Sequence, residues 1–340
     1  MPTEAIRSIA AKALEEKRVD LVIGFTPGAT PLTTQPAFIE EPSAAGKLIW
    51  NDFCVSNLAK HLLRRDKKIG IIANGCTSRN IVVYIVENQI RREDVYIIGV
   101  PCQGMLDRHK IKALLGKKKI KDIRTESDRM ILSGNAFTKE YPRRELLRQS
   151  CLYCRHKNPA IYDILVRPGE SAYGTTYGTT GEPVGEDKET AGQDIEVLEA
   201  QSGEERLEYF RTLFDRCTLC YACRNACPVC YCPTCFVDRT DPKWFDKPPA
   251  SGDAFTFHLL RAMHCAGRCT DCGACESACP VGIPITKLTR KLNKDIRTLY
   301  NFEAGLSIET PSPLSVYDLE DPQDFILTEE LKRKAKTNAS

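Results

Sequence analysis

The sequence predicts two domains: an α/β N-terminal domain with a mainly parallel sheet, and a mainly helical C-terminal domain rich in cysteine. Two observations support this fold class. In the first third of the chain, short apolar segments alternate with segments of helical periodicity, and this alternation is typical of parallel sheets. In the last third, helical segments precede two cysteine runs with the same spacing.

Three short apolar segments are expected to form the parallel strands: Val19–Phe25, Ile69–Ala73 and Val95–Val100. Helical periodicity predicts helices at Glu4–Lys17, Leu48–Arg65 and Asp107–Leu115, and a further helix that Ser78 caps and that runs through Ile90. Residues 27–46 are rich in Pro, Thr and Gly, so we expect a loop there.

Cysteines follow two of the predicted strands. Cys76 and Cys102 lie just beyond the C-terminal ends of the second and third strands, and open parallel sheets bind ligands at that edge. Cys151-x2-Cys154 adds two thiols at a spacing that seldom serves core packing. These four cysteines form a candidate metal site, which we call cluster 3. Cys54 lies inside a predicted helix, so it is either a further ligand or a buried apolar residue.

The C-terminal part contains the run Cys217-x2-Cys220-x2-Cys223-x3-Cys227-Pro228 and repeats it as Cys269-x2-Cys272-x2-Cys275-x3-Cys279-Pro280. Two-cluster ferredoxins use this run, and the fourth cysteine of each copy ligates the other cluster. The predicted ligands of cluster 1 are therefore Cys217, Cys220, Cys223 and Cys279. Those of cluster 2 are Cys269, Cys272, Cys275 and Cys227. One run alone is compatible with zinc, whereas two matched copies favour two [4Fe–4S] clusters.

Four more cysteines in this part belong to neither set: Cys230, Cys232, Cys235 and Cys265. Four thiols are what a [4Fe–4S] cluster or a zinc ion needs, so these residues are candidates for a further metal centre. The alternative is that they are unligated neighbours of clusters 1 and 2. We therefore expect [4Fe–4S] clusters at three sites, and the chain has enough thiols for a fourth centre.

The expected domain bounds follow changes in composition. Residues 1–166 form the α/β iron–sulfur domain, 167–203 a linker or loop with a Gly- and Thr-rich stretch, 204–300 the dicluster [4Fe–4S] ferredoxin-type domain, and 301–340 an extended tail. In the dicluster domain, the capping box Ser202-x2-Glu205 begins a helix that leads to Cys217, and Asp253 begins a second helix. Lys287–Tyr300 is expected to close the domain as an amphipathic helix.

Composition narrows the class of protein. The formal net charge is only +3 over 340 residues, which gives no reason to expect a nucleic-acid partner. The longest apolar run, Ile81–Val86, is too short to span a bilayer, and no apolar signal segment follows Met1. Seventeen cysteines under these conditions indicate thiolates that bind metal in a reducing compartment. We therefore expect a cytoplasmic, metal-binding protein that works under anaerobic conditions.

Four segments of the N-terminal half, which occur in this order, carry a family resemblance: Leu21-Val-Ile-Gly-Phe25, Asn74-Gly-Cys-Thr-Ser-Arg79, Ile98-Gly-Val-Pro-Cys-Gln103 and Cys151-Leu-Tyr-Cys154. Over about residues 19–166 the chain resembles the β subunit of hydrogenases and dehydrogenases that reduce the deazaflavin coenzyme F-420. The resemblance implies an iron–sulfur cluster, FAD, and electron transfer between a partner subunit and the deazaflavin. The C-terminal part looks like iron–sulfur subunits of formate dehydrogenases, hydrogenases or heterodisulfide reductase-like modules.

Two functions are consistent with these patterns. The first is an iron–sulfur electron-transfer subunit that relays single electrons within an anaerobic cytosolic redox complex, with a formate dehydrogenase, hydrogenase or heterodisulfide reductase-like partner. The alternative is a flavin-containing oxidoreductase subunit that binds FAD and reduces coenzyme F-420, NAD(P) or another small acceptor. No acid–base pair or activated nucleophile stands out in the sequence, so no catalytic residue is predicted.

Overall fold

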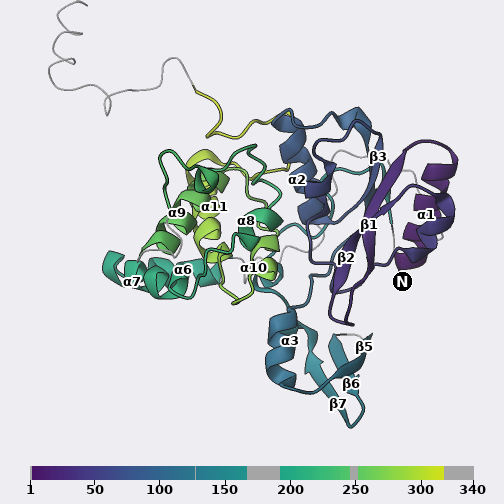
Figure 1. Ribbon diagram of the computed structural model, residues 1–340, viewed down its shortest axis with the longest axis horizontal. Coiled ribbons are helices and arrows are strands. Elements are labelled where there is room, and N and C mark those ends of the chain that lie inside the picture. The colour runs from purple at the N-terminus through teal and green to yellow at the C-terminus, as the bar shows by residue number, and fades with distance from the viewer. Residues whose placement is uncertain (1, 127, 167–191, 246–251, 318–340) are drawn as a thin grey trace, which may run out of the picture.

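A computed structural model describes residues 2–126, 128–166, 192–245 and 252–317 (Figure 1). Its main sheet has five strands in the order β2 (Thr34–Ile39), β1 (Leu21–Pro27), β3 (Ile69–Ala73), β4 (Val95–Gly99) and β8 (Ile164–Leu165). The neighbours β1–β3, β3–β4 and β4–β8 are parallel, whereas β2 pairs with β1 antiparallel. The predicted α/β character is therefore confirmed as a mixed sheet that contains parallel strands.

The main hydrophobic core lies around this sheet. Strands β1 and β3 read as continuous apolar segments because both of their faces are buried. Helix α1 (Pro2–Glu15) packs Ile6, Ile9 and Leu14 into the core at helical spacing. Helix α2 (Gly75–Val86) lies on the other side of the sheet from α1 (Figure 1). The sheet thus holds its C-terminal strand ends, and the cysteines after them, in a rigid frame.

The helix predicted at Leu48–Arg65 is wrong. This part of the chain is irregular and contains the 3₁₀ helix η2 (Leu58–Leu62), which follows another 3₁₀ helix, η1 (Pro42–Lys47). Two asparagines break the helical pattern, because their side chains compete for backbone N–H groups. The Asn51 Oδ1 accepts from the N–H of Phe53, and the Asn57 side chain caps η2.

Two other local predictions are corrected. Residues 34–39 form strand β2 rather than a loop, and this strand tolerates Pro36 because it lies at the edge of the sheet. Helix α2 begins at Gly75, where the Asn74 side chain accepts from the N–H of Thr77. Ser78 therefore lies inside the helix, and its hydroxyl donates to the Gly75 carbonyl.

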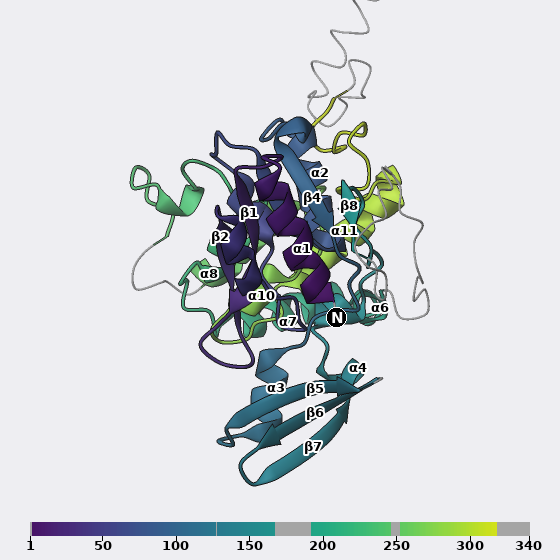
Figure 2. The same cartoon turned by 90° about the vertical axis from the view of Figure 1, so that its right-hand side faces the viewer.

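Residues 108–142 form a small unit that the sequence analysis did not resolve. Helix α3 (Arg108–Leu115) packs on an antiparallel sheet in the order β5 (Ile120–Glu126), β6 (Arg129–Gly134) and β7 (Phe137–Pro142). Its core is separate from that of the main sheet and includes Leu106, Ile111 and Leu132. The unit projects from the rest of the molecule (Figures 1 and 2).

The C-terminal part is helical, as expected, and lies beside the main sheet (Figure 1). Its helices are α6 (Gln193–Glu199), α7 (Gly203–Phe214), α8 (Ala222–Ala226), α9 (Asp253–Cys265), α10 (Ala274–Ala278) and α11 (Thr286–Tyr300). The predicted capping box is present, because Ser202 and Glu205 exchange both hydrogen bonds at the start of α7. The remaining short helices are η3 (Arg92–Asp94), α4 (Arg143–Leu146), α5 (Gln149–Leu152) and η4 (Phe236–Asp238).

The domain bounds stay a prediction. Helix α6 lies within residues 167–203, which were expected to form a linker, whereas the Gly- and Thr-rich stretch lies outside the described residues. Of the predicted tail, residues 301–317 are described and the rest is not. No helix among the described residues is both long and apolar enough to cross a membrane.

Residues just after α11 join the helical part to the main sheet. Arg79 of α2 is 5% exposed, and its Nε and Nη2 both donate to the Ala304 carbonyl, at 2.9 and 2.6 Å. The same guanidinium lies 3.3 Å from the carboxylate of Glu303. Gly305 has a φ of +78°, and a Cβ there would lie 2.2 Å from the Arg79 carbonyl oxygen. The turn therefore needs glycine, and it brings the two parts into contact.

We expect R79A to destabilise the protein by about 3 kcal/mol, because it removes both hydrogen bonds to the buried Ala304 carbonyl and one of the cations beside Glu303. The measurement is the midpoint of thermal unfolding of the anaerobic protein, together with protease cleavage within residues 301–317. R91A is the matched control, because Arg91 forms an exposed ion pair with Asp94. Equal midpoints for the two variants would contradict the role of Arg79.

Candidate metal centres

The two cysteine runs fold alike. The residue before the second cysteine has a left-handed backbone in both copies, with φ of 48° at Leu219 and 56° at Asp271. The residue after that cysteine does too, with φ of 59° at Tyr221 and 64° at Gly273. Left-handed backbone is uncommon outside glycine, so matching positions indicate a true structural repeat. Each run then enters a short helix, α8 or α10, that ends at its fourth cysteine.

The four predicted ligands of cluster 1 line one cavity, and they are Cys217, Cys220, Cys223 and Cys279. Apolar side chains, among them Phe257 and Ile283, complete its wall. The backbone N–H of Leu219 lies 3.4 Å from the Cys217 sulfur, and that of Ile283 lies 3.3 Å from the Cys279 sulfur. Thiolates held in this way suit an iron–sulfur cluster, because N–H groups stabilise negative charge on sulfur.

His258 of α9 contacts the same site. Its Nε2 lies 3.4 Å from the Cys217 sulfur, and its ring stacks on Phe214 at a centroid distance of 4.3 Å. Burial, with a smaller contribution from Arg261, lowers the pKa of His258 to about 3, so the imidazole is neutral at pH 7. Its Nδ1 has no hydrogen-bond partner among the described residues. The ring is therefore placed to donate its Nε2–H to the Cys217 sulfur.

The predicted ligands of cluster 2 lie in the interior, close enough for their charges to interact. A negative charge on Cys227 raises the pKa of each of the other three thiols, Cys269, Cys272 and Cys275. Burial raises the pKa of the Cys269 thiol to about 12. The structure also brings Cys227 beside two of the four additional cysteines, Cys230 and Cys265.

The predicted ligands of cluster 3 also line one cavity, at the C-terminal edge of the main sheet: Cys76, Cys102, Cys151 and Cys154. Burial raises the pKa of Cys102 to about 12 and that of Cys154 to about 11. The sulfur of Cys102 accepts from the N–H of Gly104 at 3.3 Å. Cys272 of the second cysteine run lines the same cavity, so the two halves of the protein meet there.

Cys54 also lines the cavity of cluster 3, although its sulfur has local partners. It lies 3.4 Å from the backbone nitrogen of Asn51 and 3.7 Å from the Asn51 Oδ1. Only 2% of the residue is exposed, and it packs within the main hydrophobic core. These contacts favour the alternative in which Cys54 is a buried apolar residue.

Arg148 connects the halves at this cavity. It is 5% exposed, and its Nη2 donates to the carbonyls of Gly273 and Cys272, the latter at 3.3 Å. A Cβ at position 273 would lie 2.2 Å from the Ser150 Oγ and 2.5 Å from the Arg148 Nη2, so the contact needs glycine there. The cavity therefore combines thiols from both halves with a buried cation.

The three thiol sets fit iron–sulfur clusters by their chemistry. A buried thiol gives up its proton only when a cation compensates the thiolate, and the raised pKa values follow from this cost. Buried guanidiniums supply part of the compensation, from Arg148 at cluster 3 and from Arg261 near clusters 1 and 2. Metal binding would supply the rest and release the protons. Ligation at each site stays a prediction.

Two of the four additional cysteines belong to a compact group of sulfurs. Cys230 and Cys265 lie close to Cys227, whereas Cys232 is exposed and Cys235 contacts Arg224. A centre made of all four additional cysteines stays a prediction.

Three residues at these sites were not predicted from the sequence: Arg148, His258 and Arg261. A signal was present for two of them, because His258 and Arg261 lie at helical spacing within an otherwise apolar stretch of α9.

Comparison with known proteins shows that the chain is similar to β subunits of redox enzymes that depend on coenzyme F-420. No family model matches it. It is 24% identical over 355 residues to the F-420-dependent formate dehydrogenase subunit beta of Methanocaldococcus jannaschii, covering 90% of this chain and 93% of that protein. It is also 24% identical over 361 residues to the F-420-dependent formate dehydrogenase 1 subunit beta of Methanococcus maripaludis, covering 91% and 92%.

Among solved structures, a chain of the F-420-reducing [NiFe] hydrogenase complex from Methanosarcina barkeri matches with a TM-score of 0.37 and 15% identity. That match covers 47% of this chain and 61% of the other, so this chain spans less than two thirds of its length. The family resemblance predicted from the sequence is confirmed by the two formate dehydrogenase subunits. It extends beyond residues 19–166 to about nine-tenths of the chain.

We expect H258F to lower the reduction potential of cluster 1 by roughly 40 mV, the equivalent of one hydrogen bond of about 1 kcal/mol for a one-electron couple. The hydrogen bond strengthens as negative charge grows on the sulfur, so its loss disfavours the reduced state. Phenylalanine keeps the stacking on Phe214. The measurement is a redox titration followed by EPR. H264F, on the exposed side of the same helix, is the control, and an equal shift in both variants would rule out the hydrogen bond.

We expect C151S/C154S to lower the iron content by about four atoms per chain, with a matching loss of acid-labile sulfide. C232S/C235S is the matched control, because it also removes two cysteines at short spacing but leaves the cavity of cluster 3 intact. Iron and sulfide analysis of anaerobically purified protein gives the answer. Unchanged iron in C151S/C154S would contradict the assignment of cluster 3.

Proposed function

We propose that this protein is an iron–sulfur electron-transfer subunit of a cytoplasmic redox complex, and that its partner is a formate dehydrogenase-type subunit. The observation that carries the proposal is the cavity of cluster 3, which lies at the contact between the two halves of the protein. We call this contact the seam. Cys76 and Cys102 of the N-terminal half line the cavity together with Cys272 of the C-terminal half. Clusters bound at the three sites would supply one-electron transfer. The rest of the proposal concerns what the chain's own residues do.

The chain connects its three thiol sets through buried contacts. Cys272 lines the cavity of cluster 3 and belongs to the predicted ligands of cluster 2. Cys275, from the same run, packs in one apolar core with Cys223 and Cys279 of cluster 1. Neighbouring ligand sets therefore share either a cavity or a buried core. This continuity supports a route from the sheet edge to the far side of the helical part.

The charged residues of the seam favour added negative charge. The cavity of cluster 3 is lined by seven basic residues, Arg79, Arg148, Arg155, Lys157, Arg290, Lys294 and Arg297. Two carboxylates, Asp271 and Glu303, line it as well. An excess of cations around buried thiolates stabilises the reduced state of a centre held there. The same cations would attract an acidic surface or an anionic ligand.

The names of two relatives support the choice of partner. Two curated proteins similar over nine-tenths of this chain are named as subunits of F-420-dependent formate dehydrogenases. We therefore propose that electrons pass between a formate-oxidising subunit and an acceptor by way of this chain.

A second candidate function is favoured by the same names. The relatives depend on coenzyme F-420, so this chain could reduce the deazaflavin itself, with FAD bound in its N-terminal half. No residue is assigned to FAD here. The two functions differ in one measurable respect, which is whether the purified chain carries a flavin.

For an electron-transfer subunit, we expect anaerobically purified full-length protein to show EPR signals of reduced [4Fe–4S] clusters with dithionite, and to yield no extractable FAD. The chain alone should not reduce coenzyme F-420 with dithionite as the electron source.

Stoichiometric FAD together with reduction of F-420 would replace this function with the second candidate. Iron-loaded protein without a reduced-cluster signal would overturn both. C151S/C154S serves as an internal comparison, because the relay requires the loss of one set of cluster signals while the others remain.

A further inference from the structure

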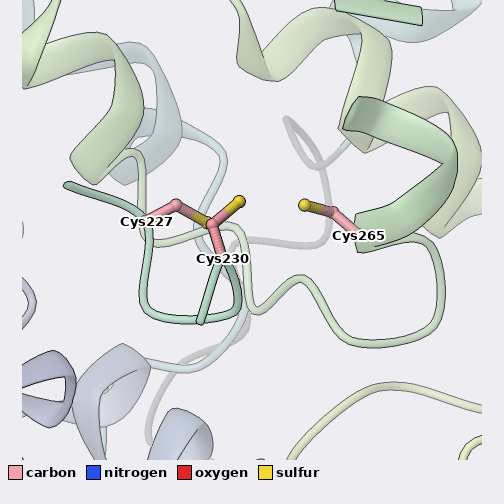
Figure 3. A group of neighbouring side chains, drawn as sticks. All are labelled: Cys227, Cys230 and Cys265. Atoms are coloured by element: carbon pink, nitrogen blue, oxygen red, sulfur yellow. The ribbon is translucent and has the colours of Figure 1, made fainter. Parts of the chain in front are cut away.

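Three cysteines form a compact group beside cluster 2. The sulfurs of Cys227, Cys230 and Cys265 all lie within 4.8 Å of one another. Figure 3 shows the Cys265 side chain pointing towards those of Cys227 and Cys230. Cys265 is the last residue of α9, and Cys227 directly follows α8. The N–H of Cys230 donates to the Cys227 carbonyl at 3.3 Å, which folds this short loop towards α9.

The spacing of these sulfurs is that of ligands to a single ion. Two thiolates on one tetrahedral ion, each with a metal–sulfur bond of about 2.3 Å, lie roughly 3.8 Å apart. The cysteines of a [4Fe–4S] cluster bind four different irons, so their sulfurs are necessarily farther apart. A group of three sulfurs within 4.8 Å therefore fits one ion better than a cluster.

A buried cation accompanies the group. Arg261 lies one helical turn before Cys265 on α9 and is only 4% exposed. Its Nη2 reaches the Cys223 carbonyl at 3.4 Å, and its Nε has no hydrogen-bond partner in the part of the chain that the structure describes. A buried guanidinium needs a negative partner nearby. Three thiolates around a divalent ion carry one net negative charge, which Arg261 would neutralise.

A hydrogen bond from helix α2, which packs on the main sheet, holds the loop that carries Cys230. The Tyr84 hydroxyl of α2 donates to the Pro228 carbonyl at 2.5 Å. Apolar side chains surround the three sulfurs, with Val83, Val229 and Ala304 in the same buried core. The group is thus held between both halves of the protein and is largely screened from water, as closed metal sites are.

We propose that Cys227, Cys230 and Cys265 bind one thiophilic divalent ion, Zn²⁺ or Fe²⁺, in a mononuclear centre beside cluster 2. Thiolate ligands in tetrahedral geometry select these ions. Cys227 is also a predicted ligand of cluster 2, so the two centres would share this residue. This centre goes beyond the proposed electron relay and does not depend on it. It also replaces the predicted site made of four additional cysteines, because Cys232 and Cys235 take no part.

The test compares metal and acid-labile sulfide per chain in anaerobically purified, full-length wild type and C230S/C265S. We expect the variant to lose about one zinc or one iron per chain and no sulfide, because a mononuclear centre contains none. Loss of about four irons with sulfide would assign the two cysteines to a cluster and overturn the proposal. Unchanged metal content would overturn it as well.

C232S/C235S is the matched control, since both residues come from the same cysteine-rich segment and lie outside the group. Its metal content should equal that of the wild type. A second measurement needs no variant and covers the case in which C230S/C265S does not fold. In native, metal-loaded wild type, iodoacetamide should label Cys232 and leave Cys230 unmodified. Ready labelling of Cys230 under these conditions would contradict the proposal.

Discussion

The contact between Arg148 and the second cysteine run is the constraint on which the arrangement of metal sites depends. A buried guanidinium donates to the carbonyls of Cys272 and Gly273, and only glycine leaves room for it at position 273. This contact aligns the edge of the main sheet with one end of the helical part. Because of it, cysteines from both halves of the protein share a cavity, and the two halves together have a continuous row of thiol sites.

Burial explains why metal binding would suit these thiols. Because they are buried, Cys102, Cys154 and Cys269 have pKa values well above the usual thiol range, so bare thiolates would be costly. Buried arginines offset part of that cost at two of the sites. The same physical arrangement serves two purposes: it excludes water from the centres, and it sets the electrostatic field in which they would change charge.

The helical part contains two similar cysteine runs, and two additional cysteines distinguish one run from the other. Both runs use left-handed residues at the same two positions, so each places its first three cysteines on a similar turn. The first run is followed by Cys230, for which the second run has no counterpart, and Cys265 precedes the second run. These two residues break the symmetry, and the structure brings them together at Cys227. The asymmetry thus marks a place where this chain departs from a simple dicluster ferredoxin pattern.

The sequence alone determined the features that depend on short-range spacing: the three central strands, the capped helix α7, the repeat of the two cysteine runs, and the family resemblance. Local side-chain hydrogen bonds and long-range packing decided the rest. Asn51 and Asn57 broke a helix that periodicity predicted, and an edge position allowed a strand through Pro36. Which additional cysteines meet could not be predicted, because Cys230 and Cys265 are joined by how α9 packs against the loop after α8. Spacing along the chain specifies a turn, whereas contact between distant turns is specified only by the shapes and charges that pack between them.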